Sequence, residues 1–225
     1  MFKDHPVLSF VYSTLVKRLK QCESPIQRAK LAHKEIDRYN QEVLDNEVVQ
    51  KYMSCKKGCA ACCHTQVSVT SDEAELLTDL YLKGEVDIDL KKLYLQSEAR
   101  NDVSKWYNIP YDIRRCLFLD ENNACKIYEN RPAVCRTNMV LSDPKTCSTI
   151  DGKVHEQRLV NTHKADMIIM ASYTVTKSAG TLPYMIWKAL NKKKAKAGSP
   201  VEQPMDTVRK RVRKAKITVS KLLSM

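Results

Sequence analysis

Eight cysteines in the middle of the sequence are the residues best suited to chemistry. They are Cys55, Cys59, Cys62, Cys63, Cys116, Cys125, Cys135 and Cys147. The first four fall within nine residues as C-x3-C-x2-CC, which brings several sulfur atoms within reach of one centre. Thiolate sulfur is a soft ligand that favours zinc, Cu(I) or iron–sulfur clusters. Buried cysteines acting as small hydrophobic side chains are the alternative, but a packed core requires no such spacing. The pattern therefore predicts a metal site.

The number of cysteines and the first residues of the chain indicate the cellular compartment of the protein. Clustered cysteines in a secreted chain would indicate disulfides, but nine is an odd number. The first residues, Met-Phe-Lys-Asp-His-Pro, place an acid and a proline where an export signal has basic and then apolar residues. The longest apolar stretch, Met167 to Ala171, is far shorter than the roughly 18 residues that span a bilayer. We therefore expect a cytoplasmic protein without a transmembrane segment.

Composition argues against several enzyme classes. The chain has 5 glycines in 225 residues and neither a G-x-x-x-x-G-K-[ST] nor a G-x-G-x-x-G motif, so glycine-dependent nucleotide folds do not fit. The spacing of Cys55, Cys59 and Cys62 matches the cysteine signature of radical S-adenosylmethionine enzymes. That signature belongs in a βα-barrel, and this sequence has no repeated strand–helix pattern.

The basic charge is concentrated at the C-terminus. Residues 188–225 carry a net charge of +10 out of the total of +12. A heptad-like apolar seam follows the charged stretch at Val208, Val212, Ala215, Val219 and Leu222. This predicts a basic linker and a basic amphipathic helix, which suits an acidic protein partner, an anionic membrane surface or nucleic acid. A helix docked on the protein's own body is the alternative.

Hydrophobic periodicity predicts mostly helices. An apolar stripe favours a helix over residues 6–20, and Ser24 and Gln27 form a capping box that begins a second helix reaching Leu44. His33 lies on the apolar face of that helix and is expected to be a packed core residue. Residues 66–70 alternate as a short strand. A second capping box, Thr70 to Glu73, begins a helix that ends at Gly84.

The second half of the chain combines a turn with further helices. Asp89 is expected to cap a helix running toward Trp106, and residues 117–128 suggest a small hairpin with a turn at 121–123. A short helix follows Pro132. Longer helices are expected over residues 155–176 and 182–190, followed by a charged linker over residues 191–200.

Arginines flank the second group of cysteines. Cys135 falls in the first turn of the short helix, where the helix dipole favours thiolate. Arg114, Arg131 and Arg136 stand beside the thiols and are candidate cofactor-binding residues, because their charges would offset sulfur anions and donate hydrogen bonds. Solvated surface arginines are the alternative.

Two distant motifs in order resemble one known family. After C-x3-C-x2-CC, the sequence reads Cys116-Leu-Phe-Leu-Asp and then Cys125-Lys-Ile-Tyr-Glu-Asn-Arg-Pro-Ala-Val-Cys135-Arg. This resembles the YkgJ-type cysteine-cluster family, described as a zinc- or iron-chelating domain. The family pattern is C-x3-C-x2-CC, C-P-x-L and C-x-I-Y-x-x-R-P-x-x-C-R. The resemblance covers residues 52–140. Leu117 departs from the usual proline, and Cys147 lies outside the core pattern.

The resemblance implies a metal-chelating domain without an agreed reaction. Flagellin lysine methylases share a similar cysteine motif, so a protein lysine methylase-like enzyme is one alternative. The sequence places no nucleophile–base pair, so catalytic residues are unknown and the enzyme question stays open. A zinc-binding structural module with a nucleic-acid- or partner-binding tail is another alternative.

Seven or eight thiolates exceed the four that a single metal site requires. One arrangement is a single [4Fe–4S] cluster held by four of the thiols. The other is two structural Zn²⁺ sites that use all eight. Adjacent Cys62 and Cys63 would reach one zinc only from a bent backbone, whereas a cluster offers several metal corners. We therefore favour an iron–sulfur protein with a redox or metal-handling role. His64 is expected to be a solvated or hydrogen-bonded residue rather than a ligand.

Together these patterns predict a mainly α fold with a small β-hairpin, a compact helical domain organised around a cysteine metal site. The expected division is residues 1–52 as N-terminal helices, residues 53–187 as the metal-binding domain, and residues 188–225 as the basic linker and tail helix.

Overall fold

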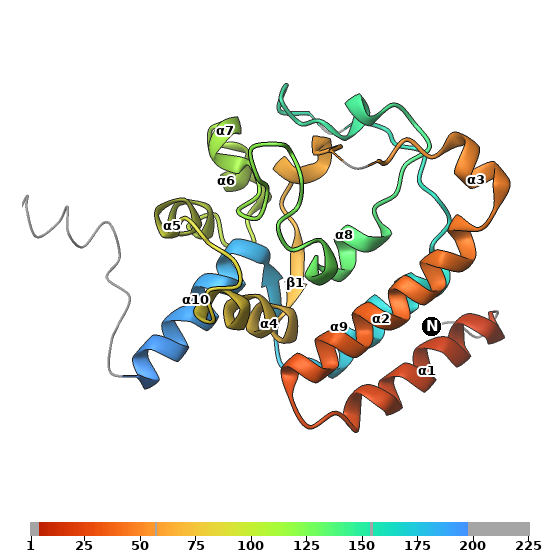
Figure 1. Cartoon of the computed structure of the whole chain (residues 1–225), viewed down its shortest axis with the longest axis horizontal. Helices are drawn as coiled ribbons and strands as arrows, with labels where there is room; N and C mark the ends of the chain where they lie inside the picture. The colour runs from red at the N-terminus through yellow and green to blue at the C-terminus, as the bar shows by residue number, and fades with distance from the viewer. Residues whose placement is uncertain (1–4, 57, 154, 198–225) are drawn as a thin grey trace, which may run out of the picture.

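The chain is mainly helical in the computed structural model, which describes residues 5–56, 58–153 and 155–197 (Figure 1). The first helices are α1 (Pro6–Lys20), α2 (Pro25–Leu44), α3 (Glu47–Tyr52), η1 (Ala61–His64), α4 (Ser71–Leu82) and α5 (Leu90–Ser97). The following ones are α6 (Val103–Tyr107), α7 (Tyr111–Arg114), η2 (Tyr128–Asn130), α8 (Ala133–Thr137), η3 (Pro144–Cys147), α9 (His163–Val175) and α10 (Leu182–Lys196). The strands are β1 (Ser68–Thr70) and β2 (Ala179–Thr181). The predicted fold class is confirmed.

Local sequence signals determine where the N-terminal helices begin. At the start of α2, Ser24 Oγ accepts the Gln27 N–H at 3.2 Å, and the Gln27 side chain accepts the Ser24 N–H at 3.2 Å. The second predicted capping box, between Thr70 and Glu73, begins α4 in the same way. Each box satisfies backbone donors that the first helical turn would leave unpaired. Helix α1 has the predicted bounds.

Two hydrophobic cores hold the helices together. The α1/α9 core joins α1, α2 and α9 through buried side chains such as Leu15, Ile36 and Ile168. The α4/α10 core joins α4, α5 and α10 and includes Phe118. Each fully buried side chain of this size contributes roughly 1.5–3 kcal/mol. His33 is buried beneath Glu73, which confirms the expectation of a core histidine.

The single sheet of the described residues joins distant segments. Strands β1 and β2 pair antiparallel, with Val69 opposite Gly180. The predicted strand at 66–70 therefore exists in shortened form. Its partner follows α9 and carries no sequence signal. A Cβ at Gly180 would lie 2.9 Å from Asn101 Oδ1, so this close approach requires glycine.

The predicted hairpin at 117–128 is present as a tight turn rather than as two regular strands. An isolated antiparallel bridge joins Leu119 to Cys125, and the Lys126 N–H donates to Phe118 O at 2.7 Å. Asn123 takes a φ of 59°, a left-handed conformation that asparagine tolerates in turns.

Two predicted elements were wrong in their bounds. The helix predicted over 155–176 begins only at His163. The residues before it are extended, because Leu159 bridges Val140 and the Val160 N–H donates to Met139 O at 2.8 Å. The helix predicted from Asp89 toward Trp106 divides into α5 and α6, with Arg100 between them at a φ of 48°.

The linker predicted at 191–200 was also wrong in its first part. Helix α10 continues to Lys196, and Lys193 lies against α4, 3.3 Å from Glu75 and 3.8 Å from Asp79. The predicted tail helix at 208–222 lies outside the described residues. The division into parts at residues 52 and 187 stays a prediction. No helix in the described ranges has the length and apolar character needed to cross a bilayer.

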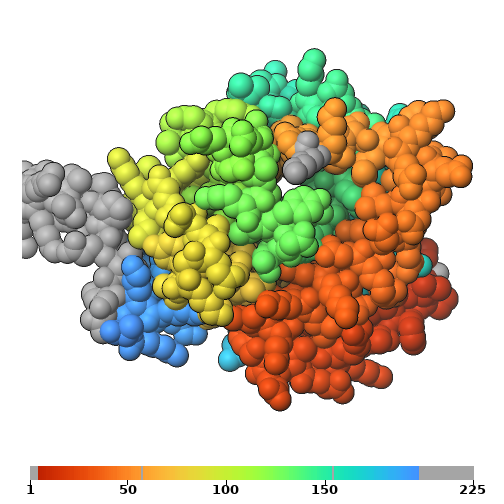
Figure 2. Space-filling view, viewed as in Figure 1, coloured from red at the N-terminus to blue at the C-terminus, as the bar shows by residue number. Residues whose placement is uncertain are grey.

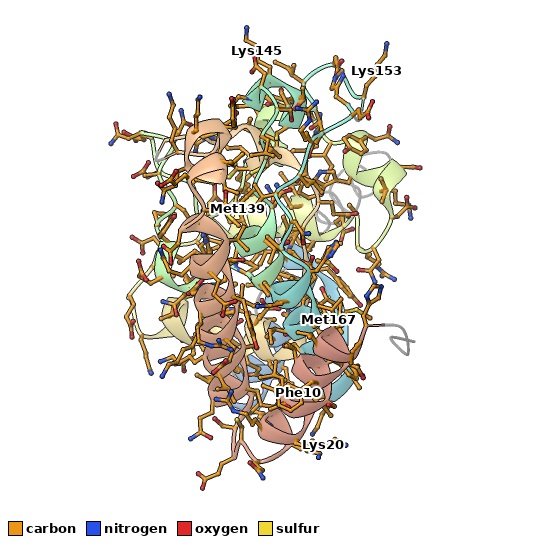
Figure 3. The ribbon with its side chains drawn as sticks, turned by 90° about the vertical axis from the view of Figure 1, so that its right-hand side faces the viewer. Phe10, Lys20, Met139, Lys145, Lys153 and Met167 are labelled. Atoms are coloured by element: carbon orange, nitrogen blue, oxygen red, sulfur yellow. The ribbon has the colours of Figure 1, made fainter. Side chains whose placement is uncertain are left out.

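The cysteine-bearing segments gather at one end of the molecule. Residues 45–64 (orange), 115–137 (green) and 139–153 (teal) lie beside one another in Figure 2. In Figure 3, Lys145 and Lys153 stand at the end of the molecule opposite Phe10 and Lys20 of α1. The helices of the α1/α9 and α4/α10 cores therefore form one part of the molecule, which we call the helical base. The cysteines lie on short helices and irregular segments beside it.

Candidate metal centre

The first cysteine is attached to the segment that follows α8. The Ser54 N–H donates to Val140 O at 2.9 Å, and the Val140 N–H donates to Cys55 Sγ at 3.4 Å. Gly58 then takes a φ of +84°, which an L side chain adopts only with strain. This conformation turns the chain from Cys55 toward Cys59. A backbone N–H that points at a sulfur atom stabilises thiolate, as ligand thiols require.

The adjacent pair, Cys62 and Cys63, lies on the 3₁₀ helix η1. Thr65 closes this turn, because its N–H and its Oγ1 both donate to Cys62 O, at 3.2 and 2.8 Å. The bent backbone that the sequence required for neighbouring ligands is therefore present.

The second cysteine segment is joined directly to the first. The Cys116 N–H donates to Cys63 O at 2.7 Å, and the bridge between Leu119 and Cys125 places Cys125 across the tight turn. Cys116 and Cys125 pack against the α4/α10 core. The backbone that carries these thiols is therefore fixed by the hydrophobic core.

Cys135 and Cys147 complete the set. Cys135 lies in the middle of α8, whose first N–H, at Ala133, donates to Glu73 Oε1 at 2.7 Å. Cys147 ends η3, which packs against η1, and Cys147 is 5% exposed. All nine cysteines of the chain are free thiols. Cys22 stands apart, in the turn between α1 and α2.

The thiols fall into two groups according to which sulfur charges act on one another. We call Cys55, Cys59, Cys62 and Cys147 the outer thiols, and Cys63, Cys116, Cys125 and Cys135 the inner thiols. Among the outer thiols, burial and then the charges of the other three raise the pKa of Cys147 to about 11. Burial and the charges of Cys59 and Cys62 likewise raise the pKa of Cys55.

Burial likewise dominates the inner thiols. It raises the pKa of Cys116 to about 11, with a further contribution from Cys125. It raises the pKa of Cys135 still more, and Cys116, Cys62 and Cys125 add to the effect. Cys62 acts on members of both groups, so it lies where they meet. The prediction that the helix dipole would favour thiolate at Cys135 was wrong, because loss of solvation outweighs the field of a five-residue helix.

Cys62 is the thiol poised to ionise. The hydrogen bond from the Cys63 thiol, with a further one from the Asn138 side chain, lowers the pKa of Cys62 to about 6, although burial opposes this. Cys63 keeps its proton, because that same bond and its burial raise its pKa. Asn138 has no signal in the sequence that would mark it for this role.

The three predicted arginines have different surroundings. The Arg131 guanidinium stacks over Tyr128, 4.3 Å from the ring centroid, and its buried Nε has no hydrogen-bond partner among the described residues. Burial raises the pKa values of Cys55 and Cys125, and Arg131 acts in the opposite direction on both. It also favours the Cys62 thiolate. Arg131 therefore faces both groups of thiols.

Arg136 and Arg114 are held by other partners. Arg136 is buried, donates to Arg131 O at 2.9 Å and pairs with Asp37, although its charge still favours the Cys125 thiolate. Arg114 donates to Thr149 Oγ1 and O, both at 3.2 Å. No contact between Arg114 and a cysteine is seen in the described residues, so its predicted role in cofactor binding has no support in the geometry.

His64 contacts aromatic residues. Its ring stacks on Tyr111 with centroids 4.2 Å apart, and its carbonyl accepts the Trp106 indole N–H at 3.1 Å. The imidazole is hydrogen-bonded to the Ala60 backbone, while its Nδ1 is buried without a partner among the described residues. Burial lowers the pKa of the imidazole.

The donor set fits a thiolate-bound metal in chemistry. Within the described ranges, no three Cys, His, Asp or Glu side chains form a group that could hold a metal ion. A zinc ion with Zn–S bonds of about 2.3 Å would bring four sulfurs within about 3.8 Å of one another. Thiolates are soft donors that suit such a metal. Arg131 faces both groups, and its buried Nε has no partner among the described residues, so it could donate to an anionic metal–thiolate centre.

One comparison with known proteins gives a match. Residues 54–163 match the model of the CxxCxxCC family, described as "Putative zinc- or iron-chelating domain". Neither the curated proteins nor the solved structures gave a match to this chain. The matched residues begin just before Cys55 and end at the first residue of α9, so they contain all eight outer and inner thiols.

Proposed function

We propose that this chain, whose residues 54–163 belong to the zinc- or iron-chelating cysteine-cluster family, carries a [4Fe–4S] cluster with a redox or metal-handling role. The observation that carries the proposal is the inner group of thiols. Cysteines from three segments of the chain act on one another's pKa there, and Cys116 and Cys125 pack against the α4/α10 core.

The crowding of the cysteines in the sequence, with Cys62 and Cys63 adjacent, favours a cluster over a single zinc ion. A cluster binds each ligand at a separate iron corner, so its ligand sulfurs stand farther apart than those around one ion. Cys63, Cys116, Cys125 and Cys135 would supply the four thiolates. Burial also suits a cluster, because exclusion of solvent and hydrogen bonds to sulfur tune its reduction potential.

The separation of the thiols into two groups favours a second candidate. Two sites with four thiols each would use all eight, as in two structural zinc sites. In that arrangement Cys55, Cys59, Cys62 and Cys147 would bind the second metal. The loops that carry the outer thiols would have to close around it.

The test is to purify the full chain without oxygen. Iron and acid-labile sulfide in equal amounts, a brown colour and an electron paramagnetic resonance signal after reduction are expected. Replacement of Cys125 by serine should remove these features, while Cys22→Ser should keep them. A colourless protein with stoichiometric zinc would overturn the iron–sulfur assignment, and two zinc ions per chain would support the second candidate.

The free thiols also support a reducing compartment. Nine cysteines without a disulfide suit the cytoplasm, where thiols remain reduced, so we propose that location. The partner expected for the basic tail remains a proposal, since that segment lies outside the described residues. Binding to an acidic partner should weaken as salt is added, and salt-independent binding would contradict it.

A further inference from the structure

Glu73 connects three helices beneath the inner thiols. This residue of α4 is 4% exposed. Its Oε2 accepts from Thr70 N at 2.8 Å and from Thr70 Oγ1 at 2.9 Å, which forms the capping box. Its Oε1 accepts from Ala133 N at 2.7 Å and contacts His33 Nε2 at 3.2 Å. Because an ionised carboxylate only accepts, His33 is the donor in that contact. The carboxylate thus joins α2 and α4 to the first residue of α8.

The other end of α8 is held from α2. Asn40 is 5% exposed, and its Nδ2 donates to Arg136 O at 2.9 Å. The Arg136 guanidinium pairs with Asp37, also on α2. A helix of five residues does not persist by itself, because one or two turns cannot offset the cost of nucleation. The hydrogen bonds from α2 and α4 hold both ends of α8, which also packs against α9 and β1.

We propose that Glu73 and Asn40 are positioning residues of the metal centre, which place Cys135 by holding the two ends of α8. The proposal rests on the proposed function, since it requires Cys135 to bind metal. Asn40 and His33 precede residues 54–163, so the N-terminal helices are a working part of the site. Contacts that orient a ligand in this way typically change metal affinity by about 10–100-fold when removed.

The neighbouring residue Asp72 provides a matched control. It is 6% exposed and lies next to Glu73 on α4. Asp72 also joins α4 to α2, because Arg28 donates to its two oxygens at 2.6 and 2.9 Å. None of the hydrogen bonds found for Asp72 in the described residues reaches α8. Loss of either carboxylate should therefore destabilise the contact between α2 and α4, while only loss of Glu73 releases α8.

The variants are Glu73→Gln and Asp72→Asn in the full chain. Glutamine keeps the size of Glu73 and one oxygen for the Thr70 N–H, but its amide N–H₂ then faces two other donors, at Ala133 and His33. Metal-free protein is titrated with Co²⁺ as the probe, and the cobalt–thiolate charge-transfer band reports the ligands. Zn²⁺ competition gives the affinity. Chemical unfolding of the metal-free protein gives its stability.

Glu73→Gln should weaken Co²⁺ binding about 10–100-fold and reduce the charge-transfer intensity. Asp72→Asn should retain wild-type affinity and band intensity, although both variants lose stability. If Glu73→Gln fails to fold, Asn40→Leu decides, because it removes the bond to Arg136 O at the other end of α8. It should also weaken Co²⁺ binding relative to wild type.

Two results would overturn the inference. Equal losses of affinity in the Glu73 and Asp72 variants would reduce the role of Glu73 to general stability. Wild-type affinity in both Glu73→Gln and Asn40→Leu would remove any role of α8 placement. A wild-type chain that binds neither Co²⁺, Zn²⁺ nor iron would instead refute the proposed function.

Discussion

The inner and outer thiols differ in what holds them in place. The inner thiols are carried by backbone that is bonded to η1, packed on the α4/α10 core or held by Glu73. The outer thiols lie on η1, on η3 and on the segment around Cys55, of which η1 packs against η3 and the Cys55 segment is bonded to Val140. Because a hydrophobic core is close-packed, it fixes the backbone that it touches. If the chain binds metal as proposed, we expect the backbone of the inner group to change less on binding than that of the outer group.

The largest expected difference between the groups is in thiol ionisation. Cys62 has a pKa of about 6, lowered first by the hydrogen bond from Cys63, whereas burial raises the pKa of Cys116 to about 11. A thiol with a lowered pKa is thiolate above that pH and becomes protonated as the pH falls through it. In metal-free protein, alkylation of Cys62 should therefore be half-maximal near pH 6, and Cys116 should stay unmodified at neutral pH.

Peptide mapping by mass spectrometry measures each site. Cys22, in the turn between α1 and α2, is the internal reference. Modification of Cys62 only at alkaline pH would remove this distinction between the groups.

Replacement of one thiol in each group is the next largest test. Cys135→Ser should lower metal affinity by more than about 100-fold, because it removes a ligand rather than a contact that orients one. Cys147→Ser should have a smaller effect on the first metal bound. Metal analysis after gel filtration measures both variants. Equal losses would show that the groups act as one site.

Removal of metal should affect the two groups unequally. A metal that binds only the folded chain adds about 2.7 kcal/mol to its stability at a free concentration of 100 times Kd. Chelation should therefore lower the unfolding free energy by about this amount. Hydrogen exchange should become faster at residues 58–64 and 138–148, and stay slow in α2 and α9. Uniform loss of protection would contradict a preformed inner group.

Replacement of Arg131 by a neutral residue should bring the pKa of Cys62 closer to the pKa values of the inner thiols, without making them equal. The hydrogen bond from Cys63 is the main cause of the low pKa of Cys62, and Arg131 adds to it. Loss of a nearby opposite charge raises such a pKa by about 1 unit. In Arg131→Met, alkylation of Cys62 should thus shift to higher pH. Arg114→Met is the control, and it should leave the pH dependence of Cys62 alkylation unchanged. Arg136→Met is less suitable, because the contacts of Arg136 hold α8 in place.

The smallest effect is expected in the helical base. Ser24→Ala removes the N-cap of α2 and should cost about 1 kcal/mol of stability. Thermal melting of the metal-free protein measures this loss. Metal affinity should not change, because Ser24 lies at the end of α2 far along the helix from Asn40. A change in affinity would show that the base and the thiols are more tightly coupled than their contacts indicate.

Local signals in the sequence were sufficient for much of the fold. The bounds of α1, the capping boxes at Ser24 and Thr70 and the buried position of His33 all follow from residues within one helical turn of each other. Such interactions do not depend on the rest of the chain. The predictions that were wrong, such as a helix over 155–162, involve residues that pair with a distant segment at 139–141.

The sequence by itself determined that the chain offers eight clustered thiols in the pattern of a metal-chelating family, on a mainly helical protein. The tertiary structure was needed to show which thiols act on one another, that the pKa of Cys62 is lowered while that of Cys135 is raised, and that Glu73 reaches α8. The physical reason is the distance along the chain over which each interaction acts. Side-chain types and their spacing determine local structure within a few residues. Burial, the charge of one sulfur on another and the hydrogen bond between Glu73 and Ala133 arise only when distant segments meet.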